Sequence, residues 1–244
     1  MNDDIKIKRD GAARRVVIGA GDGNRLDLPA IVALTDAISA PPEGAERVIV
    51  IEGQNEDFCA GRAPGKGFPA DISSLEVAEG TARPILALYA AVRACRLPVM
   101  ALVRGHALGF GCALAAVADI TWAEEGAIFS LPELNNDLPP TLALTALTPR
   151  ISAKAAGELV FSRREIDAEE ALRIGLCNRV VESGSLEIEA QALTARFANN
   201  PLRTLATVKA HLAATAYGAQ GQMADIASEL ITAALYETSR KVGK

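Results

Sequence analysis

Aromatic side chains are scarce in this chain, where phenylalanine, tryptophan and tyrosine together make up 4% of the 244 residues. A core with so few rings has to be filled by leucine, valine, isoleucine and alanine, and helices then lie in close contact. Apolar residues make up 50% of the chain and charged residues 23%, as in ordinary globular proteins and unlike disordered or fibrous ones. The length suffices for one substantial core, or for one core with a helical appendage.

Cysteine pairs, a secretory leader and long apolar runs are lacking as well. The four cysteines, Cys59, Cys95, Cys112 and Cys177, form no CxxC pair, and the first stretch, MNDDIKIKRD, is polar. We therefore expect reduced, packed thiols in a cytoplasmic protein. No apolar run reaches membrane-spanning length. A net charge of −5 and a pI near 5.2 leave no basic stripe for phosphates, so we expect binding to neither nucleic acid nor a membrane.

The hydrophobic pattern changes character near residue 130. Before it, apolar runs at 5–8, 14–18, 48–51, 98–103, 120–123 and 127–129 predict strands, and helices are predicted at 28–40, capped by Asp27, and around 85–92. Strands that alternate with helices imply right-handed crossovers and a mostly parallel sheet. After Pro140 the pattern predicts an almost wholly helical chain, with amphipathic stripes that begin at Leu186, Leu202 and Met223 and need an apolar partner.

A glycine-rich turn marks the candidate site. Within Val103–Asp119, VRGHALGFGCALAAVAD, the glycines Gly105, Gly109 and Gly111 separate a strand-like run from an alanine-rich, helix-like run. Glycine permits positive φ and close backbone approach, so the pattern predicts a tight strand-to-helix turn with outward-facing amides. A helix N-terminus carries unpaired N–H groups and a partial positive charge, which suits an oxygen that becomes negative during a reaction. The turn has the outline of an oxyanion hole.

Four segments in register resemble one known family. They are VRGHALGFGCA in the turn, FSLPE at Phe129–Glu133, DFCAG at Asp57–Gly61 and EIDAEEALRIGLCNRVV at Glu165–Val181. Together they resemble the crotonase superfamily of enoyl-CoA hydratases and isomerases, over most of the chain and in the same order. The resemblance implies an α/β fold with a ββα spiral core that carries the acyl-CoA site at 1–183. It also implies a helical C-terminal oligomerisation region at 184–244 and a homotrimer or hexamer.

The resemblance assigns catalytic roles to individual residues. In the family, two backbone amides hold the thioester carbonyl oxygen of an acyl-CoA while its α-carbon exchanges a proton. They correspond here to Ala60 and Phe110, beside Gly61 and Gly109. The general acid/base corresponds to Glu133, where partial burial would raise the carboxyl pKa toward the working pH.

The acyl-CoA substrate brings phosphates that need cations. Arg25, Arg62 and Lys66 lie in loops expected to flank the pocket, and long cationic side chains suit phosphates. The resemblance implies no metal, and no cofactor apart from the coenzyme A of the substrate itself.

Several positions depart from the pattern of the family. Ala113 stands where hydratases carry a second glutamate, so a one-base shift of a double bond is favoured over hydration, which uses two carboxylates. Asp137 stands where glycine is usual and is the nearest substitute carboxylate. Phe110 also replaces glycine, and its ring either packs in the core or shapes the acyl pocket. The sequence ends at Lys244, short of the last helical segment with which many relatives cover the pocket.

Other interpretations remain open at this point. Val16–Ile18 followed by Gly19-x-Gly21-x-x-Asn24 imitates a dinucleotide-binding turn, although asparagine replaces the usual third small residue and the acidic Glu52 lies too far along. A thioester hydrolase or decarboxylase would use the same oxyanion hole. A non-catalytic acyl-CoA-binding protein would fit the loss of one carboxylate.

Overall fold

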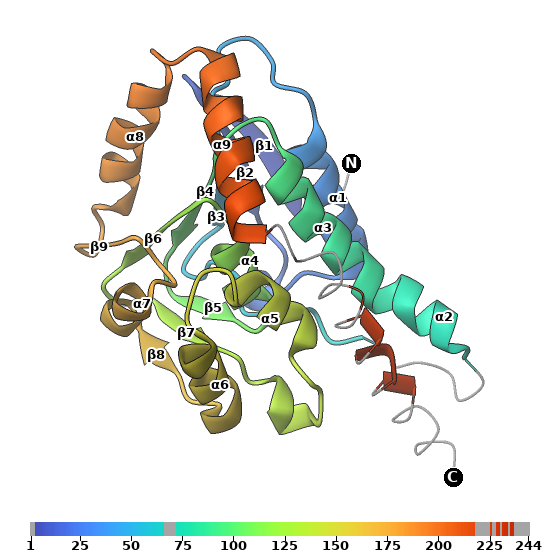
Figure 1. The fold of residues 1–244 in the computed structure, drawn as a ribbon. Coiled ribbons are helices and arrows are strands. Elements are labelled where there is room, and N and C mark those ends of the chain that lie inside the picture. The colour runs from blue at the N-terminus through green and yellow to red at the C-terminus, as the bar shows by residue number, and fades with distance from the viewer. Residues whose placement is uncertain are drawn as a thin grey trace.

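The computed structural model describes residues 3–65 and 72–217, and beyond them residues 225, 228–229, 231–233 and 235–236. In these residues one six-stranded sheet has the order β1-β2-β3-β4-β6-β9 (Figure 1). Its strands are β1 (Ile5–Asp10), β2 (Ala13–Ile18), β3 (Val48–Gly53), β4 (Val99–Val103), β6 (Ile120–Glu124) and β9 (Arg179–Val181). β1 and β2 form an antiparallel hairpin, and the pairs from β2 to β9 are all parallel. The predicted, mostly parallel sheet is confirmed.

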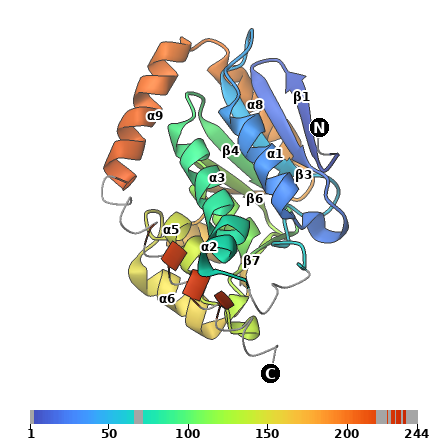
Figure 2. The same cartoon turned by 90° about the vertical axis from the view of Figure 1, so that its right-hand side faces the viewer.

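Helices cover both faces of this sheet. The helices of the described residues are α1 (Leu28–Ser39), α2 (Ser74–Val77), α3 (Arg83–Ala94), α4 (Phe110–Val117), α5 (Thr141–Leu147), α6 (Ala153–Ser162), α7 (Ala168–Ile174), α8 (Leu186–Phe197) and α9 (Leu202–Tyr217). α1 and α3 lie side by side on one face, and α8 packs against the other (Figures 1 and 2). α1 begins where the sequence predicts, because the Asp27 carboxylate accepts a hydrogen bond of 2.9 Å from the Ala30 amide. A π-helical turn, η2 (Ala78–Ala82), joins α2 to α3.

The pleat of the strands explains why two apolar clusters form. Alternate side chains point to opposite faces, so Ile49 and Ile51 join the larger cluster under α1 and α3, whereas Val48 and Val50 join the smaller one under α8. Both faces of β3 and β4 are buried, which is why their sequences are continuously apolar.

A second, three-stranded sheet positions the candidate site. β5 (His106–Leu108) pairs in parallel with β7 (Ile128–Ser130), which pairs antiparallel with β8 (Ile166–Asp167). The sequence predicts a simple turn between β4 and α4, but three residues of that turn form β5. The prediction of an almost wholly helical chain after Pro140 is likewise wrong at β8 and β9, because each short strand completes a sheet edge.

The helical C-terminal region is present, and a buried ion pair holds part of it to the core. Lys209 on α9 is 4% exposed, and its Nζ lies 2.8 Å from Asp119 Oδ2 and 2.9 Å from the Leu97 carbonyl oxygen. Val208 and Leu212, which belong to the predicted stripe of α9, are 54% and 58% exposed. The stripe that begins at Met223 lies outside the described residues.

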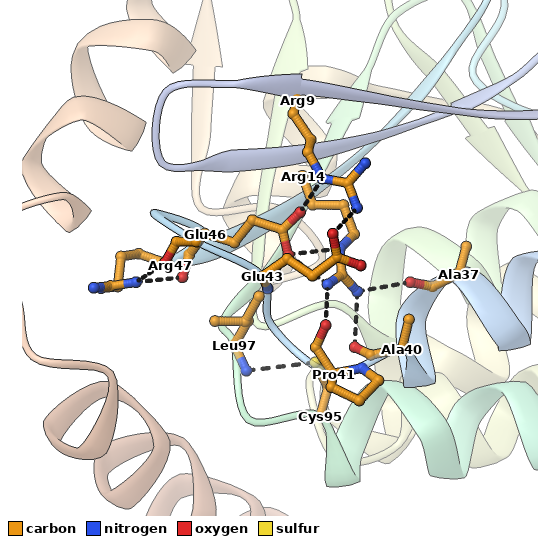
Figure 3. A network of polar contacts seen from close by, with 11 residues as sticks. Arg9, Arg14, Ala37, Ala40, Pro41, Glu43, Glu46, Arg47, Cys95 and Leu97 are labelled. Carbon is orange, nitrogen blue, oxygen red and sulfur yellow. Dashed lines mark hydrogen bonds and ion pairs between the residues drawn. The ribbon is translucent and has the colours of Figure 1, made fainter.

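A second buried network joins β2 to the end of α1 (Figure 3). Arg14 is 1% exposed and donates hydrogen bonds to the carbonyl oxygens of Ala37 (3.0 Å), Ala40 (2.8 Å) and Pro41 (2.6 Å). Its guanidinium also pairs with the buried carboxylate of Glu46. Helix C-termini leave carbonyl groups unpaired, so Arg14 acts as the C-terminal cap of α1.

No helix among the described residues is long and apolar enough to cross a membrane.

Candidate active site

Two segments far apart in sequence meet at the start of α4. A Cβ atom on Gly111 would lie 1.9 Å from the backbone oxygen of Cys59, so only glycine lets the helix approach the segment after β3 this closely. Cys59 also pairs with β5 through two backbone hydrogen bonds, from its own amide to His106 O (2.9 Å) and from the Leu108 amide to its oxygen (3.0 Å). The structure thus brings together the two segments that the sequence analysis singles out.

Glu133 lies against the first residue of this turn. It opens a short 3-10 helix, η3 (Glu133–Asn136), directly after β7, and the Ser130 oxygen of β7 accepts a hydrogen bond of 2.8 Å from the Gly109 amide. A Cβ on Gly109 would lie 3.0 Å from Glu133 Oε1, and the φ of Gly109 is +54°. The backbone conformation therefore requires glycine here, and the absence of a side chain lets the Glu133 carboxylate lie against the backbone.

The surroundings of Glu133 alter its ionisation. Burial raises the pKa of the carboxyl above its usual value, and a hydrogen bond from its own backbone amide only partly opposes this. Its Oε2 is buried and has no hydrogen-bond partner among the described residues. The expected direction of the pKa shift agrees with the structure. A raised carboxyl pKa is typical of groups that exchange protons near neutral pH.

The first residue of α4, Phe110, has an amide without a hydrogen-bond acceptor among the described residues. It follows Gly109, no side chain in that part of the chain caps the helix, and the first N–H groups of a helix have no partner within it. The Phe110 side chain is 7% exposed and belongs to the main apolar cluster, so the ring packs in the core.

Ala60, the other predicted amide, needs correction. Its N–H donates a hydrogen bond of 2.7 Å to the Gly23 carbonyl oxygen, so it is already occupied. Leu26 pairs with the next residues, with its amide donating to Gly61 O (3.1 Å) and its oxygen accepting from the Ala63 amide (2.9 Å). In a parallel pair this pattern turns the N–H of the intervening residue, Arg62, away from Leu26. Residues 59–62 lie between Leu26 on one side and β5 on the other. We therefore infer that the Arg62 amide faces the side on which α4 begins.

The predicted CoA-binding cations differ in their surroundings. Arg25 is exposed in the loop before α1. Its guanidinium donates a hydrogen bond to the Ala60 carbonyl oxygen, which holds the side chain next to the candidate site. Arg62 is partly buried, and burial lowers the pKa of its guanidinium, which Asp27 partly offsets. Its Nε has no partner within the part of the chain that the structure describes. Lys66 lies outside the described residues.

The two unusual positions near Glu133 have opposite environments. Ala113 is fully buried on α4, one helical turn beyond Gly109, and its amide donates 3.0 Å to the Gly109 oxygen. Asp137 is exposed and follows η3 with a φ of +55°, a left-handed conformation that glycine adopts most readily and that aspartate tolerates better than most residues.

Other polar groups near the turn have structural partners or are inert. His106 is hydrogen-bonded through Nδ1 to Asp57 Oδ1 at 2.7 Å, and Asp57 also accepts from the His106 amide at 2.9 Å. Burial raises the pKa of the Cys59 thiol to about 12, which agrees with its interpretation as a packing residue. No group of three or more histidine, cysteine or acidic side chains among the described residues could hold a metal ion.

The dinucleotide interpretation does not fit this geometry. The loop after β2 leads into a 3-10 turn, η1 (Asp22–Asn24), and α1 starts only at Leu28. The N-terminus of α1 is occupied by the Asp27 carboxylate, whereas a dinucleotide site needs that end free for the pyrophosphate.

Comparisons with known proteins all identify the same family. A model of the family described as Enoyl-CoA hydratase/isomerase matches residues 23–244. A probable enoyl-CoA hydratase of Rhodobacter capsulatus is 34% identical over 168 residues, covering 68% of this chain and 64% of the relative. A crotonyl-CoA hydratase of Syntrophomonas wolfei is 31% identical over 176 residues, covering 71% of this chain and 66% of the relative. The matches thus span just under two thirds of each of these two relatives.

The fold points to the same family. The crystal structure of an enoyl-CoA hydratase from Mycobacterium avium superposes with a TM-score of 0.85 at 25% identity, covering 100% of this chain and 95% of that one. The mixed α/β architecture described above is therefore the crotonase fold, as the sequence predicts. With the family model matched over nearly its whole length, the chain belongs to the enoyl-CoA hydratase/isomerase family of the crotonase superfamily.

Proposed function

We propose that this protein is an acyl-CoA enzyme in which Glu133 moves a proton at the α-carbon of a bound thioester. The single observation that carries the proposal is the position of the Glu133 carboxylate against Gly109, immediately before the free amide of Phe110. A carboxylate with a raised pKa and a helix N-terminus that can hold a negative oxygen are the two parts that enolate chemistry requires.

The oxyanion donors in this proposal are the amides of Phe110 and Arg62. Arg62 replaces Ala60, whose N–H is bonded to Gly23. The thioester oxygen accepts both hydrogen bonds as it gains negative charge, and each such donor is typically worth a factor of about 10²–10³ in rate. The side chains of Arg25 and Arg62, with Lys66, are proposed to bind the CoA phosphates. Gly61 and Gly109 let the backbone approach the thioester.

The acid/base groups of the candidate site fit isomerisation better than hydration. Glu133 takes a proton from C2 of a 3-enoyl thioester, the dienolate forms, and the same carboxyl returns the proton to C4, which leaves a 2-enoyl thioester. One base suffices for this sequence of steps. Hydration needs a second group to hold and activate water, and the alanine at position 113 provides none.

Hydration is the second candidate because the relatives named above are hydratases. It requires a substitute for the missing carboxylate, and Asp137, at the end of the same 3-10 turn as Glu133, is the group to test. Hydrolysis or decarboxylation of a thioester would use the same amides. A protein that binds acyl-CoA without turnover is the non-enzymatic alternative.

The decisive experiment follows the protons. The enzyme is incubated in D₂O with a 3-enoyl-CoA and, separately, a 2-enoyl-CoA, and the products are read by NMR and mass spectrometry. We expect deuterium at C2 and C4, migration of the double bond and no 3-hydroxyacyl product. Glu133→Gln should lower this exchange about 10²–10⁴-fold, since a positioned base contributes that factor, while thioester binding persists.

Two matched variants sharpen the result. Glu125→Gln removes an exposed carboxylate in the turn before β7 and should leave the exchange unchanged. Asp137→Asn should lower the rate only if the wild type forms 3-hydroxyacyl-CoA. Wild-type exchange in Glu133→Gln would overturn the assignment, and no exchange with either thioester in the wild type would favour a different thioester reaction or simple binding.

A further inference from the structure

A buried tyrosine faces the same interior as Glu133 and has no part in the function proposed above. Tyr89 lies on α3 and is 0% exposed, and its hydroxyl has no hydrogen-bond partner among the described residues. α3 packs against both α4 and α5, and Tyr89 belongs to the same buried cluster as Phe110, Cys112 and Ala113 of α4.

Four charged or titratable groups affect the pKa of Tyr89. They are Glu133 on η3, Arg93 on α3, Cys112 on α4 and Cys59 in the segment after β3. The pKa of Tyr89 is raised first by burial and then by the negative charge of Glu133. The pKa of the Cys112 thiol is raised by the same two causes in the same order. Tyr89 and Cys112 lie in one buried apolar cluster, against which Leu134, the neighbour of Glu133, also packs.

Two buried polar atoms in this interior complement one another. The Tyr89 hydroxyl is a donor without an acceptor, and Glu133 Oε2 is an acceptor without a donor, within the described residues. Burying a hydroxyl without a partner costs free energy that phenylalanine, with nearly the same shape, would avoid. A hydrogen bond from this hydroxyl to the Glu133 carboxylate would account for tyrosine at this position.

We propose that Tyr89 is a positioning residue whose hydroxyl donates a hydrogen bond to Glu133 Oε2, directly or through one water molecule, when an acyl thioester occupies the site. This hydrogen bond fixes Oε2, so that Oε1, which lies beside Gly109, faces the α-carbon. It also gives the site a second polar group, which the buried methyl group of Ala113 cannot supply. The inference rests on the role of Glu133 proposed above.

The test uses Tyr89→Phe, which removes the hydroxyl and keeps the ring. The rate of α-proton exchange of butyryl-CoA in D₂O is measured from pH 5 to pH 9, and butyryl-CoA affinity is measured by calorimetry. A hydrogen bond to the ionised carboxylate lowers its pKa, so its loss raises that pKa further. We expect the acidic limb of the rate profile to move up by about one pH unit, the maximal rate to fall about tenfold or more, and affinity to change less than threefold.

Two controls separate this effect from packing. Ile85→Val removes one methyl group from the same buried face of α3 and should leave the acidic limb in place. Tyr89→Phe should unfold at an equal or higher urea concentration than the wild type, because an unpaired hydroxyl has been removed. An unchanged limb in a folded Tyr89→Phe variant would overturn the inference while leaving Glu133 in its role. Exchange that persists in Glu133→Gln would overturn both.

Discussion

At the scale of single residues, contacts between backbones decide the geometry of the site. Gly111 is buried, and the oxygen of Cys59 occupies the place that a side chain would need. This contact, and not a hydrogen bond between side chains, sets how closely α4 approaches the segment that contains Gly61 and Arg62. A methyl group at Gly111 must push the two backbones apart.

Gly111→Ala is therefore expected to lower the free energy of unfolding by about 3 kcal/mol, near the upper end for overpacking, because backbone cannot move aside as a flexible side chain can. It should also reduce proton exchange, because the two amides would separate. Gly126→Ala is the matched control, since a Cβ there meets nothing within 4 Å and the φ is not positive. Urea denaturation of both variants checks this, and equal midpoints would contradict the packing argument.

The sequence locates some residues of the candidate site and misplaces others. Gly109 and Gly111 stand out in a local motif, and the family resemblance points to Glu133, which the structure places against Gly109. The occupied amide of Ala60 could not be predicted, since its acceptor, Gly23, lies far away in the sequence and its position depends on the complete fold. Tyr89 reads as one more member of an apolar helical stripe, and only burial of its hydroxyl beside Glu133 distinguishes it.

At the scale of elements, the end of α1 depends on one ion pair. Glu46 accepts from Arg14 and Arg9 and from the Glu43 amide, and it holds Arg14 beneath the last turn of α1 (Figure 3). Burial alone would raise the pKa of Glu46, but the hydrogen bonds from Arg14 and the Glu43 amide, with the charges of both arginines, outweigh burial and lower it.

Glu46→Gln should cost about 3–5 kcal/mol at pH 7, because it leaves the buried Arg14 guanidinium without its counter-ion. Glu43→Gln is the control, since Glu43 pairs with Arg9 at the exposed surface and should cost only about 0–1 kcal/mol. Urea denaturation at several pH values checks the sign. The folded-state pKa of Glu46 lies below its usual 4.5, so this contribution is complete above pH 4.5 and is lost as pH falls through the lower, folded value. A difference between wild type and Glu46→Gln that stays constant into strong acid would contradict this.

The same scale shows where sequence patterns stop being informative. α1 is predicted nearly to the residue because it carries a clear cap, and the stripe at 85–92 locates α3 without giving its ends. β5 is missed because its three residues lie between glycines and are extended only through pairing with β7 and Cys59. The buried Arg14 is also unexpected, because charge in a strand normally indicates an exposed face.

At the scale of the whole molecule, α9 presents an apolar surface that the described residues leave uncovered. The buried Lys209 fixes one side of this helix to the core, while Val208 and Leu212 point to solvent. The homotrimer or hexamer implied by the family resemblance remains a prediction, and this surface is the place to test it.

If copies of the chain associate through α9, Val208→Glu with Leu212→Glu should reduce the assembly to monomers, because two charges would be buried at the interface. Ala210→Glu with Ala214→Glu adds the same charge to exposed positions elsewhere on the helix and should leave the assembly intact. Sedimentation equilibrium measures both masses. An oligomer that survives the first double substitution would place the interface on another surface.

The contact of Gly111 with the Cys59 oxygen has a consequence for how this protein can evolve. Every amino acid except proline supplies the same peptide N–H, so substitution at Phe110 or Arg62 changes a side chain while the amide persists. Selection can therefore change the carboxylates and the acyl-pocket lining one residue at a time. The backbone geometry of the site is retained while the reaction changes.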